Sequence, residues 1–255
     1  MKLAMEIADW IKKQVKDAGK KGIVLGLSGG VDSAVVGALS KRAMGDDLLG
    51  LILSCKSQSG DEQYALKIAE KFNIKIEKIS LDDIYDMIIL KYPRASDMAK
   101  ANIKPRLRMI ALYYFANSLN YLVAGTGNKS EIAVGYFTKY GDGGVDILPI
   151  AGLFKTEVRQ LAKELGIPQE IIDRVPSAGL WVGQTDEGEM GITYEELDKT
   201  LIAIENNKTK NIDKGMLKKV KKMIVDSEHK RASIPIFKVK SKKAKGKSIP
   251  QSGIS

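Results

Sequence analysis

The sequence has 255 residues, of which 44% are hydrophobic and 28% charged, a composition typical of a globular protein with a well-buried core. No apolar run approaches the roughly 18 residues that span a bilayer, and a single cysteine excludes an internal disulfide. Acidic residues in the first turns, Glu6 and Asp9, predict an amphipathic helix there and not a signal peptide. We therefore expect a cytoplasmic enzyme with no membrane partner.

The net charge of +10 is concentrated at the carboxyl end of the chain. Six lysines and no acidic residue follow Ala232, and without these lysines the net charge is +4. Residues 238–255 are rich in Lys, Ser and Gly, which predicts a disordered tail after a single domain of residues 1–237. The tail is either a solvated, solubilising segment or an electrostatic site for a partner. A nucleic-acid ligand is not expected.

The predicted elements alternate between helices and strands in the first half of the chain. A first helix, ending near residue 19, is indicated by one apolar face made of Leu3, Ile7, Trp10, Ile11 and Val15. Short apolar or alternating runs predict strands at residues 22–27, 48–54 and 75–80. Helices are predicted after these strands, to about residue 44, at residues 61–72 and at residues 81–92.

The second half continues this alternation. A helical stretch, interrupted near Pro105, reaches residue 120; strands are predicted at 121–126 and 146–150, and a helix at 154–165. A loop at 176–191 precedes helices at 194–206 and 213–231. We therefore predict an α/β fold, a Rossmann-like doubly wound parallel sheet of about five strands with helices on both faces. Two glycine-rich segments leave the carboxyl ends of strands, where such sheets bind ligands.

The first of these segments indicates a phosphate-binding loop. Its sequence is Gly26-Leu27-Ser28-Gly29-Gly30-Val31-Asp32-Ser33. Glycines between a strand and a helix let backbone N–H groups approach phosphate oxygens, and the start of the helix adds favourable polarity. Asp32 stands where a Walker loop places lysine, so charge neutralisation must come from elsewhere, for example from Mg²⁺ held by Asp32 against the phosphates.

The string Ser-Gly-Gly-x-Asp-Ser is similar to the pyrophosphate loop of N-type ATP pyrophosphatases, which cleave ATP between the α and β phosphates. Further strings narrow the family, and in this order they resemble the ammonia-dependent NAD synthetases from the first helix to about residue 236. They are NIKPRLRM at residues 102–109, GTGNKSE at 125–131, GYFTKYGDG at 135–143, PSAGL at 176–180, QTDE at 184–187 and EHKR at 228–231.

The resemblance implies a role for each matching position. ATP would be bound by Gly26, Leu27, Ser28, Gly29, Gly30, Val31, Asp32, Ser33, Thr126, Lys155 and Ser177. Mg²⁺ would be bound by the carboxylates of Asp32 and Glu131. The second substrate, deamido-NAD, is anionic and would be bound by Arg106, Lys139, Asp146, His229 and Lys230.

Each assigned residue also has an ordinary structural alternative. The charged side chains could be solvated, could form surface ion pairs or could lie in the first turn of a helix, and the hydroxyls of Thr126 and Ser177 could be turn or capping groups. Asp142, in the Gly-Asp-Gly segment, either orients ammonium by its charge or is a turn aspartate.

The implied reaction has two steps and uses no side-chain nucleophile. The nicotinate carboxylate of deamido-NAD attacks the α-phosphorus of ATP, releasing pyrophosphate and forming an acyl-adenylate. Ammonia then attacks the activated carbonyl, and AMP leaves with NAD as the other product. Ammonia rather than glutamine is expected as the nitrogen source, because hydrolysis of glutamine requires a further amidase domain.

Two other functions stay open on the sequence alone. One is a related adenylating enzyme that thiolates tRNA, although such enzymes usually carry catalytic cysteines and here Cys55 is alone. The other is a protein that senses adenine nucleotide without turnover. The resemblance also implies a homodimer with deamido-NAD near the subunit interface, and the apolar helical stretch 109–115 offers a surface for it.

Overall fold

The structure is a computed structural model that describes residues 1–57, 59–92, 94–181 and 183–238. The tail predicted at residues 238–255 lies outside the described residues after Lys238, and the assignment of residues 1–237 to one domain stays a prediction. Within the described ranges, no helix combines the length and the apolar character needed to cross a membrane.

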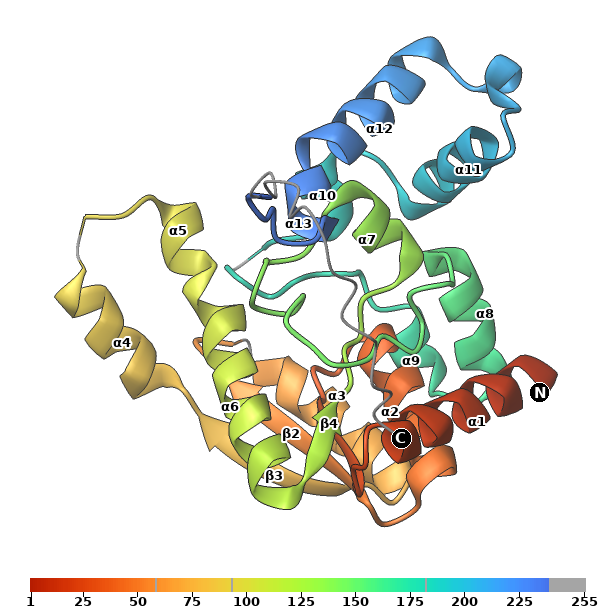
Figure 1. The fold of residues 1–255 in the computed structure, drawn as a ribbon. Helices are drawn as coiled ribbons and strands as arrows, with labels where there is room; N and C mark the ends of the chain where they lie inside the picture. The colour runs from red at the N-terminus through yellow and green to blue at the C-terminus, as the bar shows by residue number, and fades with distance from the viewer. Residues whose placement is uncertain (58, 93, 182, 239–255) are drawn as a thin grey trace, which may run out of the picture.

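Helices surround one parallel sheet in the described residues (Figure 1). The strands are β1 (Gly22–Gly26), β2 (Leu48–Ser54), β3 (Lys75–Ser80) and β4 (Tyr121–Val123). The helices of the first half are α1 (Lys2–Asp17), α2 (Val31–Met44), α3 (Ser59–Lys71), α4 (Asp82–Lys91), α5 (Asp97–Ala101) and α6 (Ile103–Leu119). Those of the second half are α7 (Lys129–Val134), α8 (Lys155–Glu164), α9 (Gln169–Ile172), α10 (Asp186–Met190), α11 (Tyr194–Glu205), the short 3₁₀-helix η1 (Thr209–Asn211), α12 (Lys214–Asp226) and α13 (Glu228–Arg231).

The strand order is β3-β2-β1-β4, and every pair is parallel. The chain builds the sheet from β1 outward through β2 to β3 and then returns to place β4 on the other side of β1. The order therefore reverses between β1 and β4, and an open parallel sheet binds ligands at the carboxyl ends of the strands at such a point. This topology confirms the predicted α/β fold with a parallel sheet.

The prediction of a fifth strand at residues 146–150 is wrong for the described residues. That segment makes only an isolated parallel bridge between Ala124 and Ile147. The Asp146 side chain accepts the N–H of Val123 at 2.8 Å, so a carboxylate takes a bond that a strand would otherwise receive from a backbone carbonyl. Pro149 comes soon after the bridged residue Ile147 and has no N–H to continue the hydrogen bonds of a strand.

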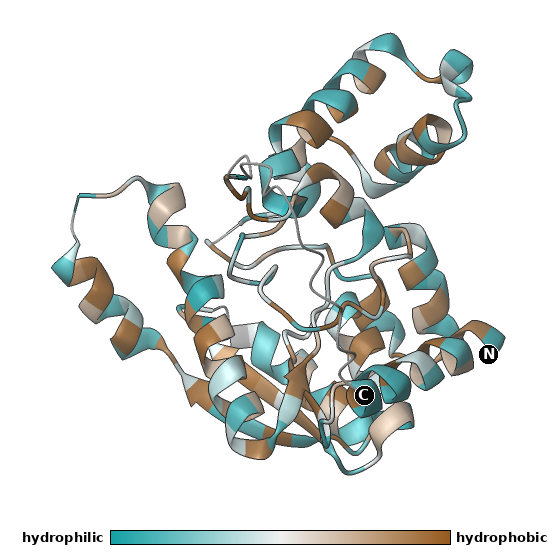
Figure 2. Cartoon of the chain, viewed as in Figure 1, coloured by the Kyte–Doolittle hydropathy of each residue, from teal (hydrophilic) through white to brown (hydrophobic). Residues whose placement is uncertain are grey.

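Helices cover both faces of the sheet, each with its own core (Figures 1 and 2). On one face, residues of α1, α2, α3 and α8 pack against β1 and β2. On the other, α6 packs against β1 and β4, with Leu107 and Ala116 buried. A third cluster joins α7, α10, α11 and α12 beyond the carboxyl ends of the strands, around the fully buried Tyr194. Burial on both faces explains why β1 and β2 are continuous apolar runs, whereas β3, at the edge of the sheet, alternates and is mostly exposed.

Three predicted helical segments differ in detail from the structure. The buried face of α1 is Ala4, Ala8, Ile11 and Val15, while Leu3 and Trp10 of the predicted face are 41% and 40% exposed. The predicted interruption near Pro105 lies at Asn102, between α5 and α6, and Pro105 is in the first turn of α6, where its missing N–H loses no helical bond. The helix predicted at 213–231 breaks at Ser227 into α12 and α13.

Candidate active site

The phosphate loop joins β1 to α2 and is shaped by one glycine with a left-handed backbone. Gly29 has φ +78°, and a Cβ atom there would lie 2.5 Å from the carbonyl oxygen of Asp61, so α3 packs directly on the loop. The Ser33 hydroxyl donates to the Gly30 carbonyl at 2.9 Å and accepts from the Ser28 N–H at 3.2 Å. These bonds fix the loop at the start of a 14-residue helix, where backbone polarity favours an anion.

Lys155 is the most buried charged side chain of the site, with 2% of it exposed. Its ammonium contacts the carboxylate of Asp32 on α2 and lies 3.1 Å from the carboxylate of Glu131 on α7; each of these side chains is 16% exposed. Burial lowers the pKa of Lys155, but the two carboxylates more than reverse this effect and hold its pKa above the usual range. The lysine is therefore charged, and its charge is balanced within the protein.

The backbone positions of these three groups depend on local caps. Asn128 is fully buried, caps α7 in a capping box with Glu131, and donates from Nδ2 to Asp32 at 3.0 Å. Its backbone N–H donates to the Glu131 carboxylate at 3.3 Å, so one residue contacts both carboxylates. Asp198, from α11, accepts the N–H of Thr156 at 2.9 Å and thereby caps the first turn of α8, which carries Lys155. These contacts join segments that are distant in sequence.

A hydrogen-bonded network extends from Glu131 to α10. The Tyr194 hydroxyl lies 3.2 Å from Glu131 and 3.0 Å from Asp186, and its ring lies under the Lys155 ammonium at 4.8 Å from the ring centre. The Tyr136 hydroxyl contacts Asp186 at 3.0 Å and Glu189 at 2.9 Å. Burial raises the pKa of Glu131 to about 7 and also raises the pKa of Asp186.

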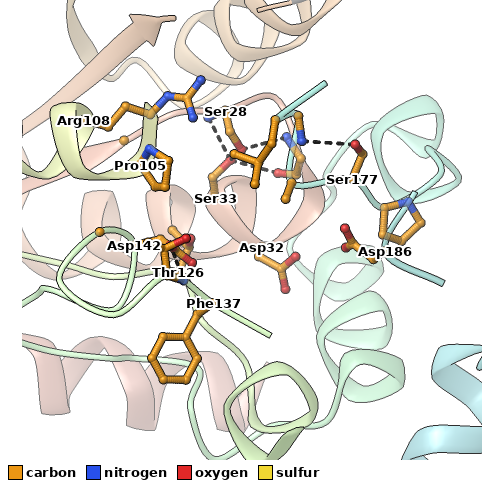
Figure 3. A pocket seen from close by; sticks show the side chains of 18 of the residues that line it. Ser28, Asp32, Ser33, Pro105, Arg108, Thr126, Phe137, Asp142, Ser177 and Asp186 are labelled. Carbon is orange, nitrogen blue, oxygen red and sulfur yellow. Dashed lines mark hydrogen bonds between the residues drawn. The ribbon is translucent and has the colours of Figure 1, made fainter. Parts of the chain in front are cut away.

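A cavity of about 1030 Å³ opens in front of these groups, at the carboxyl ends of the strands (Figure 3). The phosphate loop, the end of β2, the residues that follow β4, the first turns of α6 and, from one later segment, residues 174–180, 183–186 and 189 line it. Arg174 reaches back from that segment to contact Asp61 and the carbonyl of Gly29, and Lys104 donates to the carbonyl of Leu180 at 2.6 Å. The segment therefore forms a wall of the cavity that is attached at two points.

The structure brings the predicted ATP-binding residues together. All but Gly29, whose Cα faces α3, line the large cavity, as does Glu131. The Ser177 hydroxyl also accepts the N–H of Gly179 at 3.1 Å, in keeping with the turn alternative. Within the described residues no group of three or more His, Cys, Asp or Glu side chains is arranged to hold a metal. Two carboxylates facing a phosphate loop nevertheless suit Mg²⁺, which often takes one or two protein carboxylates with its remaining ligands from phosphate and water.

The predicted deamido-NAD residues divide into two groups. Arg106, Lys139, His229 and Lys230 line a smaller cavity of about 340 Å³, and Lys230 also lines the large one, so the two spaces adjoin. Asp146 lines neither cavity. Its carboxylate accepts from the Tyr113 hydroxyl at 2.9 Å, which places it beside α6.

Asp142 lies in the wall of the large cavity, opposite the phosphate loop in Figure 3. It accepts the backbone N–H of Thr138 at 2.8 Å, which is the bond that a turn aspartate makes. Burial raises its pKa, and Lys230 and Arg108 act against that rise. The residue therefore combines the turn role with a position from which its charge reaches the cavity.

Sequence reasoning missed several groups of this site: Asn128, Tyr136, Asp186, Tyr194, Arg108 and Arg174. Asn128 and Asp186 stand inside the quoted strings GTGNKSE and QTDE, and a polar residue within such a string was the available signal. Tyr194 begins an amphipathic helix and gave no signal, because its hydroxyl meets Glu131 across 63 residues of sequence.

Comparisons with known proteins agree with this site. The NAD synthase family profile matches residues 3–234. The NH(3)-dependent NAD(+) synthetase of Finegoldia magna is 48% identical over 231 residues, which are 90% of this chain and 93% of that protein. An NMN synthetase structure from Francisella tularensis matches with a TM-score of 0.85 at 38% identity, over 92% of this chain and 98% of that one. An NH3-dependent NAD synthetase from Campylobacter jejuni, in complex with nitrate, gives 0.82 at 30% identity, over 93% and 98%. The chain therefore belongs to the NAD synthase family.

Proposed function

We propose that this protein forms NAD from deamido-NAD, ATP and ammonia through an acyl-adenylate, releasing AMP and pyrophosphate. The observation that carries the proposal is the pair of adjoining cavities. One is built on a phosphate loop with Asp32, Glu131 and Lys155, and the other has the cations Arg106 and Lys139 in its lining. Lys230 lines both, so a nucleotide triphosphate in the first and an anionic nucleotide in the second would meet.

The direct test is to incubate the protein with ATP, Mg²⁺, ammonium and deamido-NAD and to measure NAD, AMP and pyrophosphate. All three products should appear in equal amounts. A protein that binds ATP and releases no pyrophosphate would instead be a nucleotide sensor. Asp32→Asn keeps the shape of the side chain without its charge, so it should fold normally and lose turnover. A variant with normal activity would remove Asp32 from the site.

In the proposed mechanism the protein orients two anions and offsets their charge. The backbone of the phosphate loop and the start of α2 hold the departing pyrophosphate, and Lys155 is aimed at the same end of the cavity. Asp32 and Glu131 would hold Mg²⁺, which would neutralise charge on the phosphate oxygens. Arg106, Lys139 and Lys230 bind the dinucleotide and direct its carboxylate toward the α-phosphorus. Asp142, in the cavity wall, orients ammonium for the second step.

Adenylation can be separated from phosphorylation by isotope. Deamido-NAD labelled with heavy oxygen in its carboxylate should transfer one labelled oxygen to AMP, because the attacking oxygen stays on phosphorus when ammonia displaces it. Label in inorganic phosphate, with ADP as the nucleotide product, would contradict the proposal. The loop supports adenylation, because it lacks the lysine that P-loop enzymes direct at the β and γ phosphates.

Ammonia is the proposed nitrogen donor. The Finegoldia magna relative, which this chain matches over 93% of its length, is named as NH(3)-dependent. NAD should therefore form with ammonium and not with glutamine. Robust formation from glutamine in assays from which ammonium has been removed would contradict this assignment.

A mononucleotide is the second candidate substrate. The Francisella tularensis structure with a TM-score of 0.85 is an NMN synthetase, and the chemistry at the carboxylate would be the same. Measuring kcat/KM with deamido-NAD and with nicotinate mononucleotide decides between the two. A higher value for the mononucleotide would make the protein an NMN synthetase, with the adenylation site unchanged.

A homodimer is also proposed. Large apolar side chains on neighbouring helices are exposed, including Leu90 on α4 (83%) and Tyr114 (67%) and Ile110 (59%) on α6. None of the residues of α4 is buried, although it carries hydrophobic stretches (Figure 2). Asp146 bonds to Tyr113 of α6 and lines neither cavity, which supports a role toward the substrate of a second copy. Light scattering should give a dimer for the wild type and a smaller species for Tyr114→Glu; a wild-type monomer at micromolar concentration would contradict the proposal.

A cytoplasmic location and the absence of a nucleic-acid ligand stay predictions.

A further inference from the structure

Four cationic side chains line the large cavity, and they differ in how their charge is balanced. Lys155 pairs with two carboxylates, and Arg174 pairs with Asp61. Lys230 donates to the carbonyls of Gly135 and Phe137 at 2.7 and 2.9 Å. Neither Lys230 nor Arg108 forms an ion pair with a carboxylate among the described residues. A cation in an enclosed site is normally paired. Because Lys230 also lines the smaller cavity and is assigned to the dinucleotide, Arg108 is the cation left for a further anion of the ligand.

The guanidinium of Arg108 is nevertheless held in a fixed orientation. Its Nε donates to the carbonyl of Leu53 at 3.1 Å, and its Nη2 donates to the Ser57 hydroxyl at 3.2 Å. A guanidinium has five N–H donors, so these two bonds leave donors that can meet a ligand in the cavity. Burial lowers the pKa of Arg108, while the carboxylates of Asp142 and Asp61 act in the opposite direction without pairing with it.

The position of Arg108 indicates which anion it would meet. Leu53 is near the carboxyl end of β2, and β2 pairs with β1, which leads into the phosphate loop. Arg108 therefore lies at the cavity beside Ser28, at the start of the loop, whereas Asp32 lies farther from Arg108 than Ser28 does in the same view (Figure 3). Lys155 contacts Asp32 and so marks the same end of the loop. An ATP molecule with its leaving pyrophosphate beside Lys155 and Asp32 would present its α-phosphate toward the Arg108 side.

We propose that Arg108 binds the α-phosphoryl group of ATP and stabilises it during adenylation. This inference rests on the proposed function, because it assigns a further catalytic residue to the same reaction. In the step, a carboxylate oxygen of the substrate forms a bond to the α-phosphorus, and the bond from that phosphorus to the oxygen bridging to the β-phosphorus breaks. The electron pair leaves with pyrophosphate, and no proton moves. Arg108 donates N–H bonds to non-bridging oxygens throughout, a planar arrangement that suits phosphate.

Binding of product fragments tests the assignment independently of turnover. Isothermal titration would measure adenosine, AMP and inorganic pyrophosphate with the wild type, Arg108→Met and Arg108→Lys. Loss of charge-assisted bonds to the α-phosphate should weaken AMP binding by about tenfold or more in Arg108→Met and less in Arg108→Lys. Adenosine and pyrophosphate should bind as they do to the wild type. Arg159→Met is the matched control, because Arg159 pairs with Glu195 at the surface, so this variant should bind all three fragments normally.

Kinetics add a readout that a purely structural role would not move. Pyrophosphate release with saturating substrates should fall by about tenfold to a hundredfold in Arg108→Lys, which keeps the charge but loses the fork. Equal loss of adenosine and AMP binding would make Arg108 an adenosine contact and overturn the assignment, as would a selective loss of pyrophosphate binding. If Arg108→Met fails to fold, Arg108→Lys alone decides. A wild type that binds AMP through Arg108 but forms no NAD would refute the proposed function and leave this contact standing.

Discussion

Replacing Lys155 by methionine tests whether this ammonium occupies the place where a metal cation would bind. Methionine has nearly the length of lysine without its charge, so the packing against the Tyr194 ring is largely kept. The carboxylates of Asp32 and Glu131, each 16% exposed, then lose the cation between them. Like charges remain close together in a partly buried site.

The magnitude follows from the burial of the group. Removing one partner from a buried ion pair costs about 3–5 kcal/mol, and protonation of Glu131, whose pKa is already raised to about 7, relieves part of this. We therefore expect the free energy of unfolding to fall by about 2–4 kcal/mol without Mg²⁺. For a chain of this size, that corresponds to a decrease in Tm of about 4–16 °C.

Mg²⁺ should reverse part of the loss in the variant. If the vacated site binds Mg²⁺ with a Kd of about 1 mM, then 10 mM Mg²⁺ contributes about 1.4 kcal/mol of stability by mass action. Thermal unfolding of the wild type and Lys155→Met, with and without Mg²⁺ and in the absence of ATP, measures both effects. Lys222→Met is the control, because its pair with Asp226 is exposed and contributes little. An equal Mg²⁺ response in the wild type and Lys155→Met, or an unchanged Tm in the variant, would refute this reasoning.

Three further changes test other parts of the site. Gly29→Ala should lower the free energy of unfolding by about 2 kcal/mol or more and abolish ATP binding, because φ is +78° and the new Cβ would meet α3. Urea titrations measure the loss of stability. Gly152→Ala is the control and should behave as the wild type, because a Cβ there meets nothing within 4 Å. Tyr194→Phe should cost about 1–3 kcal/mol at pH 8, because the buried Asp186 carboxylate loses one of its two tyrosine hydroxyl donors and keeps only Tyr136, and a smaller loss is expected at acid pH, where Asp186 is protonated. The raised pKa of Glu131 means that the folded protein binds the extra proton, so without Mg²⁺ its contribution to stability should fall as pH rises from about 4.5 to about 7. Urea titrations should show this decline relative to Glu131→Gln, and parallel curves would contradict it.

The parts of the fold that were predictable depend on local sequence. The parallel sheet was predictable because strands alternate with helices along the chain. The two central apolar strands, β1 and β2, were also recognisable, because strands buried on both faces are continuously apolar. The phosphate loop was predictable because its glycines and its position after a strand are contiguous. The absence of the fifth strand was not predictable, because it depends on the long-range hydrogen bond that the Asp146 carboxylate accepts from the N–H of Val123.

The parts of the site that were missed depend on long-range contacts. Asp32 meets Lys155 across 123 residues and Asn128 across 96, and no periodicity carries such information. Lys155 was expected to contact ATP. The structure adds that two carboxylates already hold its ammonium, which depends on how α8 is placed by Asp198. Position in the sheet, not spacing in the sequence, decides these partners.

The aspartate in the phosphate loop follows from where the fold obtains its positive charge. A Walker loop carries its lysine within the loop, whereas here the cations of the cavity come from other segments: Arg108 from α6, Lys155 from α8, Arg174 from the chain after α9 and Lys230 from α13. A lysine brought in from a separate helix and buried needs a carboxylate to remain charged, and Asp32 provides one from the first turn of α2. Because the cations are spread over several segments of the chain, charge can be offset along the whole length of a triphosphate, including its α-phosphate. A loop without lysine and a cavity with dispersed cations are therefore two parts of one arrangement, which suits attack at the α-phosphorus better than attack at the γ-phosphorus.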